Sequence, residues 1–520
     1  MKTFLMYKNR DFDPKQILSQ RDRKRSWASN NLNLDRILPW NERDLTQDLG
    51  LDILFKTMSG GDEFLYEVAK VALLSSVTDI DTIRYRQYVF SDCLKSTQII
   101  KNIYQIATDA IMSEETNTSW FFTKHPSSIL YQSVGVLEIF VDMLRRLRAV
   151  VDQSTDEFKS EGFLRLFTML QKELTDEYFA LVEEHLRYLK FREGVLISAE
   201  LGKGSKGTNY MLRKSPEDVR GWLTRLIMKN RKGYTYQIHP RDDIGARTLS
   251  ELNDAGLNLV ANATAQSVDH ILGFFQMLRT ELAFYIGYLN LYAKVAELGE
   301  RTCVPVPMVA GSRRLMFSGL YDLSLALNVG RKVVGNDLNA DGKNLFVITG
   351  ANTGGKSTFL RSIGIAYLMM QAGMFVPADS FSAGVCESVF THYKREEDRW
   401  MESGKWDEEL GRMSEIIDHL KPNSLLLFNE SFASTNEREG SEIADQVVKA
   451  LLEERVKVFF VTHLYSLAKS FLDQKLDHAV FLRAERLPDG TRPFKLIKAE
   501  PKQTSYGEDL YSKIFSDGRI

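Results

Sequence analysis

The sequence has few cysteines, few prolines and no long apolar run. Its three cysteines, Cys93, Cys303 and Cys386, are far apart and odd in number, which argues against a disulfide framework and against a zinc site. No apolar run approaches the roughly 20 residues that cross a bilayer, and the apolar stretch within Met1–Lys8 is too short for a secretory signal. We therefore expect a cytoplasmic protein without membrane contact.

The bulk composition is that of a soluble globular protein with more than one domain. Hydrophobic residues make up 44% and charged residues 26% of the 520 residues. A chain of this length predicts about two to four folding units. The formal net charge of −2 excludes little, because a near-neutral chain can still gather positive charge on one face and bind nucleic acid there.

The first three hundred or so residues favour helix. Phe163–Leu189 and Ser267–Leu298 carry apolar residues at three- and four-residue spacing and almost no proline. The second segment is about 30 residues long, so as one helix it would form a lever of roughly 45 Å. Two ordinary helices with a kink near Gly287 explain the same pattern equally well.

A basic segment lies between these helical stretches. Leu201–Gly233 has only Glu217 and Asp218 as acidic residues, and its glycines predict a turn. Residues 234–238 alternate like a strand. A small mixed module inserted between helices would explain this composition, and its cations could contact DNA phosphates; a solvated hairpin without a partner is the alternative. The candidate DNA contacts are Lys203, Lys206, Arg213, Lys214, Arg225, Lys229, Arg231 and Lys232.

Beyond residue 303 the pattern changes to short apolar strands that alternate with helices, which is typical of an α/β domain. Leu345–Thr349, Leu425–Asn429 and Lys457–Thr462 have the length and composition of buried strands. Thr358–Gln371 favours a helix.

A phosphate-binding loop follows the first of these strands. Residues 350–357 read Gly-Ala-Asn-Thr-Gly-Gly-Lys-Ser and match the pattern G-x-x-x-x-G-K-[ST]. Glycines let successive backbone N–H groups curl around phosphate oxygens, Lys356 would reach the β- and γ-phosphates, and the Ser357 hydroxyl would hold Mg²⁺. The position between a strand and a helix is the context that such a loop requires, so the sequence predicts binding of ATP with Mg²⁺.

Two further strands end in polar residues. Leu425–Asn429 is followed by Glu430, whose carboxylate could orient or deprotonate the attacking water; a structural role near a helix start is the alternative. Asn429 stands where an aspartate usually supports Mg²⁺, and its amide gives less electrostatic help. The third strand ends in Thr462 and His463, and the histidine could sense the γ-phosphate or be structural.

Together these pieces resemble the MutS family. The match is specific across Asn336–Gly507, and it includes the loop with its lead-in, Phe375–Ala378, the switch histidine His463 and Ser505–Gly507. A hairpin turn at Pro488–Gly490 is expected before that last motif. Upstream, Thr78–Gln87 is similar to the start of the family's helical core.

The resemblance implies a fold class of α + α/β. We expect an N-terminal arm over residues 1–35 and a mostly helical core and lever region over 36–303, with a clamp-like insertion at about 196–265. An ABC-type P-loop α/β ATPase domain is expected over 304–520. The residues implied to bind nucleotide are Asn336, Gly350, Asn352, Thr353, Gly354, Gly355, Lys356, Ser357 and Thr358. Ser357, Asn429 and Glu430 would face the metal, and Lys356, Glu430 and His463 would act in catalysis.

The family also implies a homodimer and a DNA substrate. Ser403, Gly404 and Lys405 are the best candidates for the loop that reaches the partner's nucleotide, although an exposed charged helix explains the segment as well. Unusual residues follow both motifs, Trp406–Glu409 after this loop and Ser431–Thr435 after Glu430. We expect no N-terminal mismatch-recognition domain, so double-stranded or branched DNA is the predicted partner. A nucleotide-gated clamp or scaffold with little turnover, contacting protein, is the alternative.

Overall fold

The computed structural model describes residues 1–10, 12, 38–75, 77–118, 125–191, 194–213, 237–395 and 404–503. The chain packs into two compact units that are not consecutive halves. The first comprises Met1–Thr3, Gln98–Phe158 and Leu164–Arg279, and the second comprises Phe4–Thr97, Lys159–Phe163 and Thr280–Ile520. The predicted division after residues 35 and 303 follows chain order and stays a prediction.

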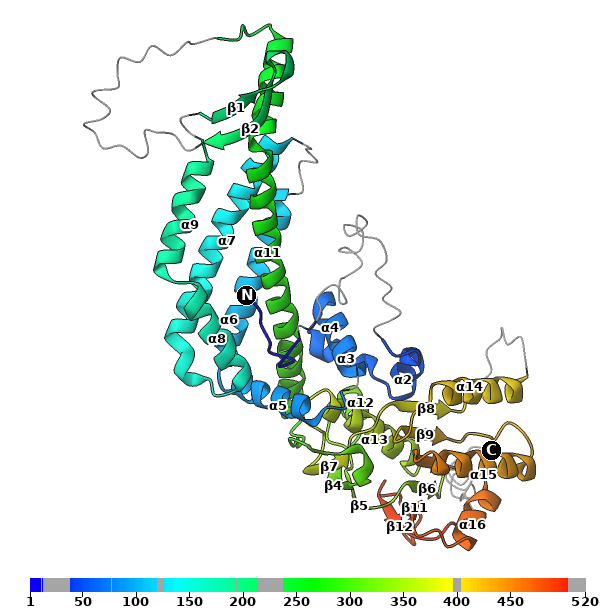
Figure 1. Cartoon of the computed structure of the whole chain (residues 1–520). Coiled ribbons are helices and arrows are strands. Elements are labelled where there is room, and N and C mark those ends of the chain that lie inside the picture. The colour runs from blue at the N-terminus through cyan, green and yellow to red at the C-terminus, as the bar shows by residue number, and fades with distance from the viewer. Residues whose placement is uncertain are drawn as a thin grey trace, which may run out of the picture. The chain divides into compact units, whose positions relative to one another are not determined.

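The first unit is mainly helical (Figure 1). It contains α6 (Thr97–Thr118), α7 (Pro126–Ser154), α8 (Glu161–Glu173), α9 (Asp176–Leu189) and the first part of α11 (Asp243–Glu297). The apolar residues of α7 recur at helical spacing, so Leu130, Val134 and Leu137 share a buried face. By length and composition this helix could also cross a membrane. Half of its most apolar stretch is buried inside the structure, which is compatible with a core helix.

The structure corrects one helical prediction and decides between two alternatives for another. The segment Phe163–Leu189 is divided into α8 and α9, because the Thr175 side chain caps a new helix by accepting a hydrogen bond from the backbone N–H of Tyr178. By contrast α11 continues unbroken through Gly287 for 55 residues, so the kinked alternative is wrong. A Cβ at Gly287 would lie 3.4 Å from the Met58 side chain of α3 (Asp52–Ser59), an ordinary contact distance, so the packing there does not require glycine.

The described part of the basic insertion is a hairpin. β1 (Leu196–Leu201) and β2 (Gly207–Arg213) pair antiparallel around the predicted turn. Gln237 and Ile238, the described end of a predicted strand, have no regular structure, and α11 begins at Asp243. The predicted insertion, residues 196–265, therefore includes the beginning of α11.

The second unit contains an α/β core. Its helices and strands before the core sheet are α2 (Glu42–Asp48), α3, α4 (Glu63–Leu74), α5 (Ile80–Lys95), the end of α11, β3 (Val306–Met308), β4 (Leu315–Leu320), α12 (Leu323–Val329) and β5 (Asn336–Asn339). A four-stranded sheet has the order β3-β7-β4-β5, where β7 is Ser380–Gly384. Mixed helix and sheet in this arrangement agrees with the predicted α + α/β class.

The core sheet has six strands in the order β12-β11-β6-β10-β9-β8. β8 (Val389–Tyr393), β9 (Leu425–Asn429), β10 (Lys457–Val461), β6 (Leu345–Thr349) and β11 (Ala479–Ala484) are parallel, and β12 (Leu496–Lys498) pairs antiparallel with β11. The predicted strands match β6 and β9 and differ from β10 by one residue. The β11–β12 hairpin contains the predicted turn at Pro488–Gly490.

Helices cover both faces of this sheet, which explains why its central strands are apolar throughout. α14 (Lys405–His419), α15 (Glu437–Glu453) and α16 (Tyr465–Asp473) contribute to one core cluster with Leu426, Phe428 and Phe460. α13 (Lys356–Gln371) lies on the opposite face, where a Cβ at Gly364 would meet Leu427. The sheet therefore holds the carboxyl ends of β6, β9 and β10 side by side.

Candidate nucleotide site

The predicted phosphate-binding loop, residues 350–357, connects β6 to α13. Gly350 and Gly355 have φ angles of 115° and 88°, which residues with a Cβ rarely adopt. A Cβ at Gly350 would also lie 2.9 Å from the backbone nitrogen of Ala484 in β11. The first backbone N–H groups of α13 follow directly, so the loop and the helix end provide donors and a favourable dipole for phosphate.

Lys356 is buried in this loop. Its Nζ donates hydrogen bonds to the carbonyl oxygens of Gly350 at 3.1 Å and Ala351 at 3.0 Å. Burial lowers the pKa of Lys356, the Glu430 carboxylate opposes that shift, and Arg492 adds to it. The ammonium thus lies beside the loop that would surround a phosphate.

Ser357 and Asn429 are brought together from α13 and β9. The Ser357 hydroxyl donates to the Asn429 amide oxygen at 2.9 Å. Both offer neutral oxygen ligands, and the described residues contain no group of three or more His, Cys, Asp or Glu side chains that could hold a metal ion. These donors fit a Mg²⁺ ion that arrives on a triphosphate, since Mg²⁺ commonly takes few protein ligands together with phosphate oxygens.

Glu430 and His463 meet at the ends of β9 and β10. The His463 Nε2 lies 3.2 Å from the Glu430 Oε1, because the neighbouring strands are in register with Val461 opposite Asn429. The hydrogen bond from His463 lowers the pKa of Glu430, although burial opposes the shift. Glu430 has a φ angle of 57°, a strained backbone of the kind found at functional sites.

The connection between β11 and β12 contacts the loop between β6 and α13. Arg492 donates hydrogen bonds to the Asn352 carbonyl oxygen and the Thr353 hydroxyl. Asn336 accepts a hydrogen bond at 2.7 Å from the backbone N–H of Leu496. A pocket of about 420 Å³ lies beside the loop. Among the residues lining it are Asn336, Thr353, Gly355, Thr358, Val333, Val334, Phe359 and Phe494.

Sequence comparisons match two parts of the chain to known families. Residues 78–298 match the family model of the MutS2 N-terminal domain, and residues 346–514 match that of MutS domain V. This chain is a member of the MutS family. The predicted resemblance is thereby confirmed.

Three relatives illustrate the extent of the similarity. The DNA mismatch repair protein MutS of Lactobacillus acidophilus is 27% identical over 42% of this chain, and that of Syntrophomonas wolfei is 33% identical over 44%. The endonuclease MutS2 of Lacticaseibacillus casei is 31% identical over 40% of the chain. Each match covers 27% of the relative's own length.

Next to the MutS motifs, the structure contains a buried polar cluster that sequence reasoning missed. His392 of β8 is fully buried; its Nδ1 lies 2.8 Å from the Ser431 Oγ and its Nε2 lies 3.0 Å from the Glu409 carbonyl oxygen. The Glu409 carboxylate accepts a hydrogen bond from the Phe432 N–H. Burial, with Arg412 as the next cause, lowers the pKa of His392 to about 4.

This cluster connects two segments that follow predicted site residues. Glu409 lies on α14, shortly after Gly404 and Lys405 of the loop predicted to reach the partner's nucleotide. Ser431 and Phe432 directly follow Glu430. Because a carbonyl oxygen can only accept, Nε2 of the neutral His392 carries the proton, while the Ser431 hydroxyl donates to the His392 carbonyl oxygen and lies beside Nδ1. The unusual sequences Trp406–Glu409 and Ser431–Thr435 were the only signal, and no spacing rule linked them to His392.

The remaining predicted site residues are less completely described. Gly404 precedes α14 and Lys405 begins it, whereas Ser403 lies outside the described residues, as do Ser505–Gly507. Lys203, Lys206 and Arg213 are exposed on or beside the β1–β2 hairpin. The other candidate DNA contacts, Lys214, Arg225, Lys229, Arg231 and Lys232, lie outside the described residues.

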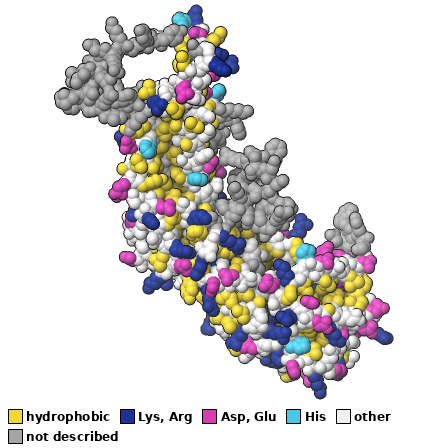
Figure 2. Space-filling model, in the orientation of Figure 1, with side chains coloured by type: hydrophobic (Ala, Val, Ile, Leu, Met, Phe, Trp, Pro, Cys, Tyr) yellow, Lys and Arg dark blue, Asp and Glu magenta, His cyan; other side chains and the backbone are white. Residues whose placement is uncertain are grey.

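Surface charge gives the DNA hypothesis no further support in the view shown. On the face in Figure 2, Lys and Arg side chains are interspersed with Asp and Glu among the coloured residues of both units. The DNA hypothesis depends on the basic residues of the hairpin and on family membership, and it stays a prediction.

Proposed function

We propose that this MutS-family chain is a Mg²⁺-dependent cytoplasmic ATPase that acts as a homodimer and uses ATP binding and hydrolysis to control its grip on DNA. One observation carries the proposal. Lys356, Ser357, Asn429, Glu430 and His463 gather at the carboxyl edge of three adjacent parallel strands. In open α/β sheets this edge is where ligands bind.

Each side chain has a role in the proposed reaction. Lys356 would exchange its two loop carbonyls for the β- and γ-phosphate oxygens. Ser357 and Asn429 would hold Mg²⁺, which neutralises charge on the phosphates when bound. Glu430 would orient or deprotonate the attacking water. His463, now bonded to Glu430, would sense the γ-phosphate by exchanging one partner for the other.

The pocket beside the loop would take the nucleotide base. Its volume of about 420 Å³ and its apolar lining, which includes Val333, Val334 and Phe494, suit a flat heterocycle. Asn336 and Thr358 lie in the same pocket, in keeping with their predicted part in nucleotide binding. Gly404 and Lys405 would reach the partner's nucleotide in the dimer.

DNA as the partner rests on the family and on the basic insertion. The relatives are a mismatch repair protein and an endonuclease by name. For this chain we propose double-stranded DNA, with branched or recombining forms preferred to mismatches. Each Lys or Arg that contacts a phosphate would release condensed counterions and make binding depend on salt.

Nucleotide-dependent DNA binding tests this proposal. We expect fluorescence anisotropy with duplex and four-way-junction DNA to give different affinities in ATP and ADP, and Lys356→Ala to abolish the difference. Replacing Arg225, Lys229 and Arg231 by Gln should weaken binding and flatten its salt dependence by up to about three counterions. Equal affinities in both nucleotides would contradict control of DNA by ATP.

A second function is favoured by Asn429. Its neutral amide gives Mg²⁺ less charge support than an aspartate would, which favours slow hydrolysis of bound ATP. The chain would then act as a nucleotide-gated clamp or scaffold that contacts protein. Such a chain would bind Mg-ATP as tightly as an active ATPase, while its hydrolysis would be no faster than that of Lys356→Ala.

A further inference from the structure

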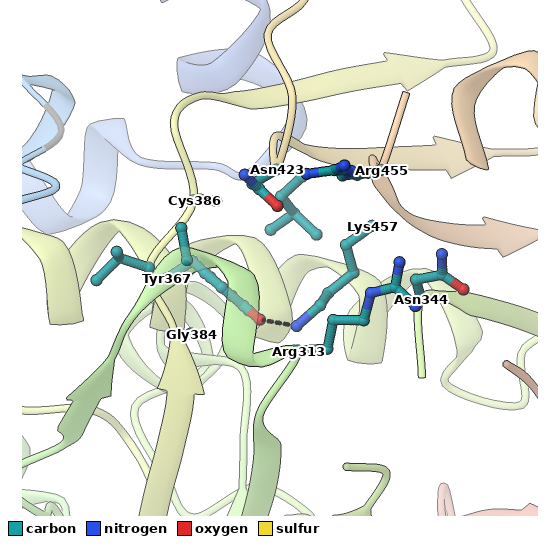
Figure 3. Close-up of a pocket in the computed structure, with 11 residues that line it drawn as sticks. Arg313, Asn344, Tyr367, Gly384, Cys386, Asn423, Arg455 and Lys457 are labelled. Carbon is teal, nitrogen blue, oxygen red and sulfur yellow. Dashed lines mark hydrogen bonds between the residues drawn. The ribbon is translucent and has the colours of Figure 1, made fainter. Parts of the chain in front are cut away.

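A second pocket lies at the opposite edge of the core sheet from the nucleotide site. Its lining includes Arg313, Asn344, Tyr367, Asn423, Arg455 and Lys457 (Figure 3). Lys457 is the first residue of β10, and Asn344 directly precedes β6. The nucleotide residues follow the other ends of these strands, so the two sites do not share side chains.

The lining of this pocket is positively charged. Arg313, Arg455 and Lys457 contribute three cations, and no Asp or Glu is among the lining residues. Within the described ranges no ion pair involves any of the three. The nearby carboxylate of Asp341 is paired with Arg314 instead.

Lys457 is held among neutral partners. Its Nζ donates to the Tyr367 hydroxyl at 2.9 Å and lies 3.4 Å from the Arg314 carbonyl oxygen. Figure 3 shows the Arg313 side chain extending alongside this ammonium. Burial lowers the pKa of Lys457 to about 8. Lys457 is partly exposed, and a partly buried cation without an ion-pair partner is costly, so an anion in the pocket would reduce that cost.

An amide and the backbone add to the case. The Oδ1 of Asn344, a residue only 4% exposed, has no hydrogen-bond partner among the described atoms. Rotating that amide by half a turn would present N–H donors in its place. Arg313 and Arg455 have φ angles of 50° and 62°, a region that glycine enters more readily than arginine. Two strained loops thus each carry a guanidinium to one pocket.

We propose that this pocket binds a small phosphate-type oxyanion between Arg313, Arg455 and Lys457. The enclosed volume of about 20 Å³ admits roughly one or two oxygen atoms, since a single water needs about 10–15 Å³ on this measure. The anion inserts an oxygen beside Lys457 and leaves the others to the exposed guanidinium groups, which match phosphate geometry. A base or sugar does not fit the enclosed part.

Calorimetric titration of the full chain with inorganic phosphate tests this site. The Lys356→Ala variant serves as the parent, because it weakens the competing phosphate loop. We expect one phosphate per chain in the parent and at least a tenfold weaker affinity in Arg313→Gln/Arg455→Gln. Lys457→Met should weaken binding similarly, and the exposed-loop double variant keeps the test valid if Lys457→Met fails to fold.

Arg438→Gln is the matched control, since Arg438 is an exposed arginine of α15 paired with Glu442, and it should leave the affinity unchanged. Equal phosphate affinity in the parent and the double variant, or no binding in the parent, overturns the proposal. Adding a short duplex separates the sources of the phosphate group. If the duplex competes with inorganic phosphate and the double variant abolishes this competition, the site binds nucleic-acid phosphate. If the duplex does not compete, the site binds free phosphate. Neither outcome depends on ATP hydrolysis.

Discussion

The Ser357 hydroxyl donates a hydrogen bond to the Asn429 amide oxygen across 2.9 Å, which joins the start of α13 to the end of β9. An aspartate at position 429 would accept the same bond and add a negative charge beside the proposed Mg²⁺ position. We therefore expect Asn429→Asp to raise the kcat of Mg-ATP hydrolysis by about tenfold, which corresponds to roughly 1.4 kcal/mol of transition-state stabilisation.

Asn436→Asp is the matched control for that substitution. Asn436 is exposed and caps α15 by accepting a hydrogen bond from the Glu439 N–H, and aspartate caps a helix equally well. It adds the same charge without changing the Ser357–Asn429 pair. A kcat unchanged in Asn429→Asp, or raised equally in both variants, would contradict the account of Asn429.

The Glu430–His463 contact predicts a pH effect. The hydrogen bond from His463 lowers the pKa of Glu430, so the carboxylate persists to lower pH than it otherwise would. Removing the imidazole in His463→Ala should raise that pKa and move the acidic limb of the kcat/KM–pH profile to higher pH. His463→Gln, which keeps an N–H donor, should move it less. An acidic limb at the same pH in all three proteins would mean that Glu430 is not the base.

Glu409 predicts a local opening. Its carboxylate accepts the hydrogen bond from the buried Phe432 N–H, two residues after Glu430. Leaving a buried N–H unsatisfied costs about 1–3 kcal/mol, so amide exchange at Phe432 should accelerate by roughly 10- to 100-fold in Glu409→Ala. Glu409→Gln keeps an acceptor oxygen and should exchange nearly as slowly as the wild type. Hydrogen exchange followed by mass spectrometry measures the exchange rate at Phe432. Equal rates in the Ala and Gln variants would mean that the Glu409 hydrogen bond does not hold this segment closed.

His392 predicts a loss of stability in mild acid. Burial lowers its pKa to about 4 in the folded chain, whereas an unfolded histidine titrates near 6.5. Between these pH values the unfolded state therefore binds more protons than the folded state. The contribution of His392 to the free energy of unfolding is complete above about pH 6.5, and it falls by about 3 kcal/mol as the pH drops to about 4. The urea midpoint of the ATPase unit should fall less over this window in His392→Gln. The same fall in both proteins would assign the loss to other groups.

Local sequence patterns predicted the framework of the site better than its connections. The loop at residues 350–357, the strand that ends at Asn429 and the strand that precedes His463 are runs of consecutive residues, so spacing alone located them. The contacts of His392 with Ser431 and Glu409 join three separate elements, and their pairing depends on how the helices pack on the sheet. The contact of Arg492 with Asn352 likewise joins two separate segments, the β11–β12 connection and the loop after β6.

The long helix illustrates a different limit. Apolar spacing near Gly287 fits one helix or two, because glycine lowers helix propensity without forbidding a helix. The choice is made by packing, since Phe284, Tyr285 and Tyr288 on either side of Gly287 are all buried in the core. Propensity therefore left open what tertiary contact decides.

The central claim is an ATPase coupled to DNA, and steady-state Mg-ATP hydrolysis tests it most directly. Turnover should be measured alone and with linear duplex, mismatched duplex and four-way-junction DNA, with Lys356→Ala as the blank. The account predicts turnover above the blank that one DNA form, the junction, stimulates most. Turnover equal to the blank with every DNA, while Mg-ATP still binds, would contradict it and leave a nucleotide-gated switch.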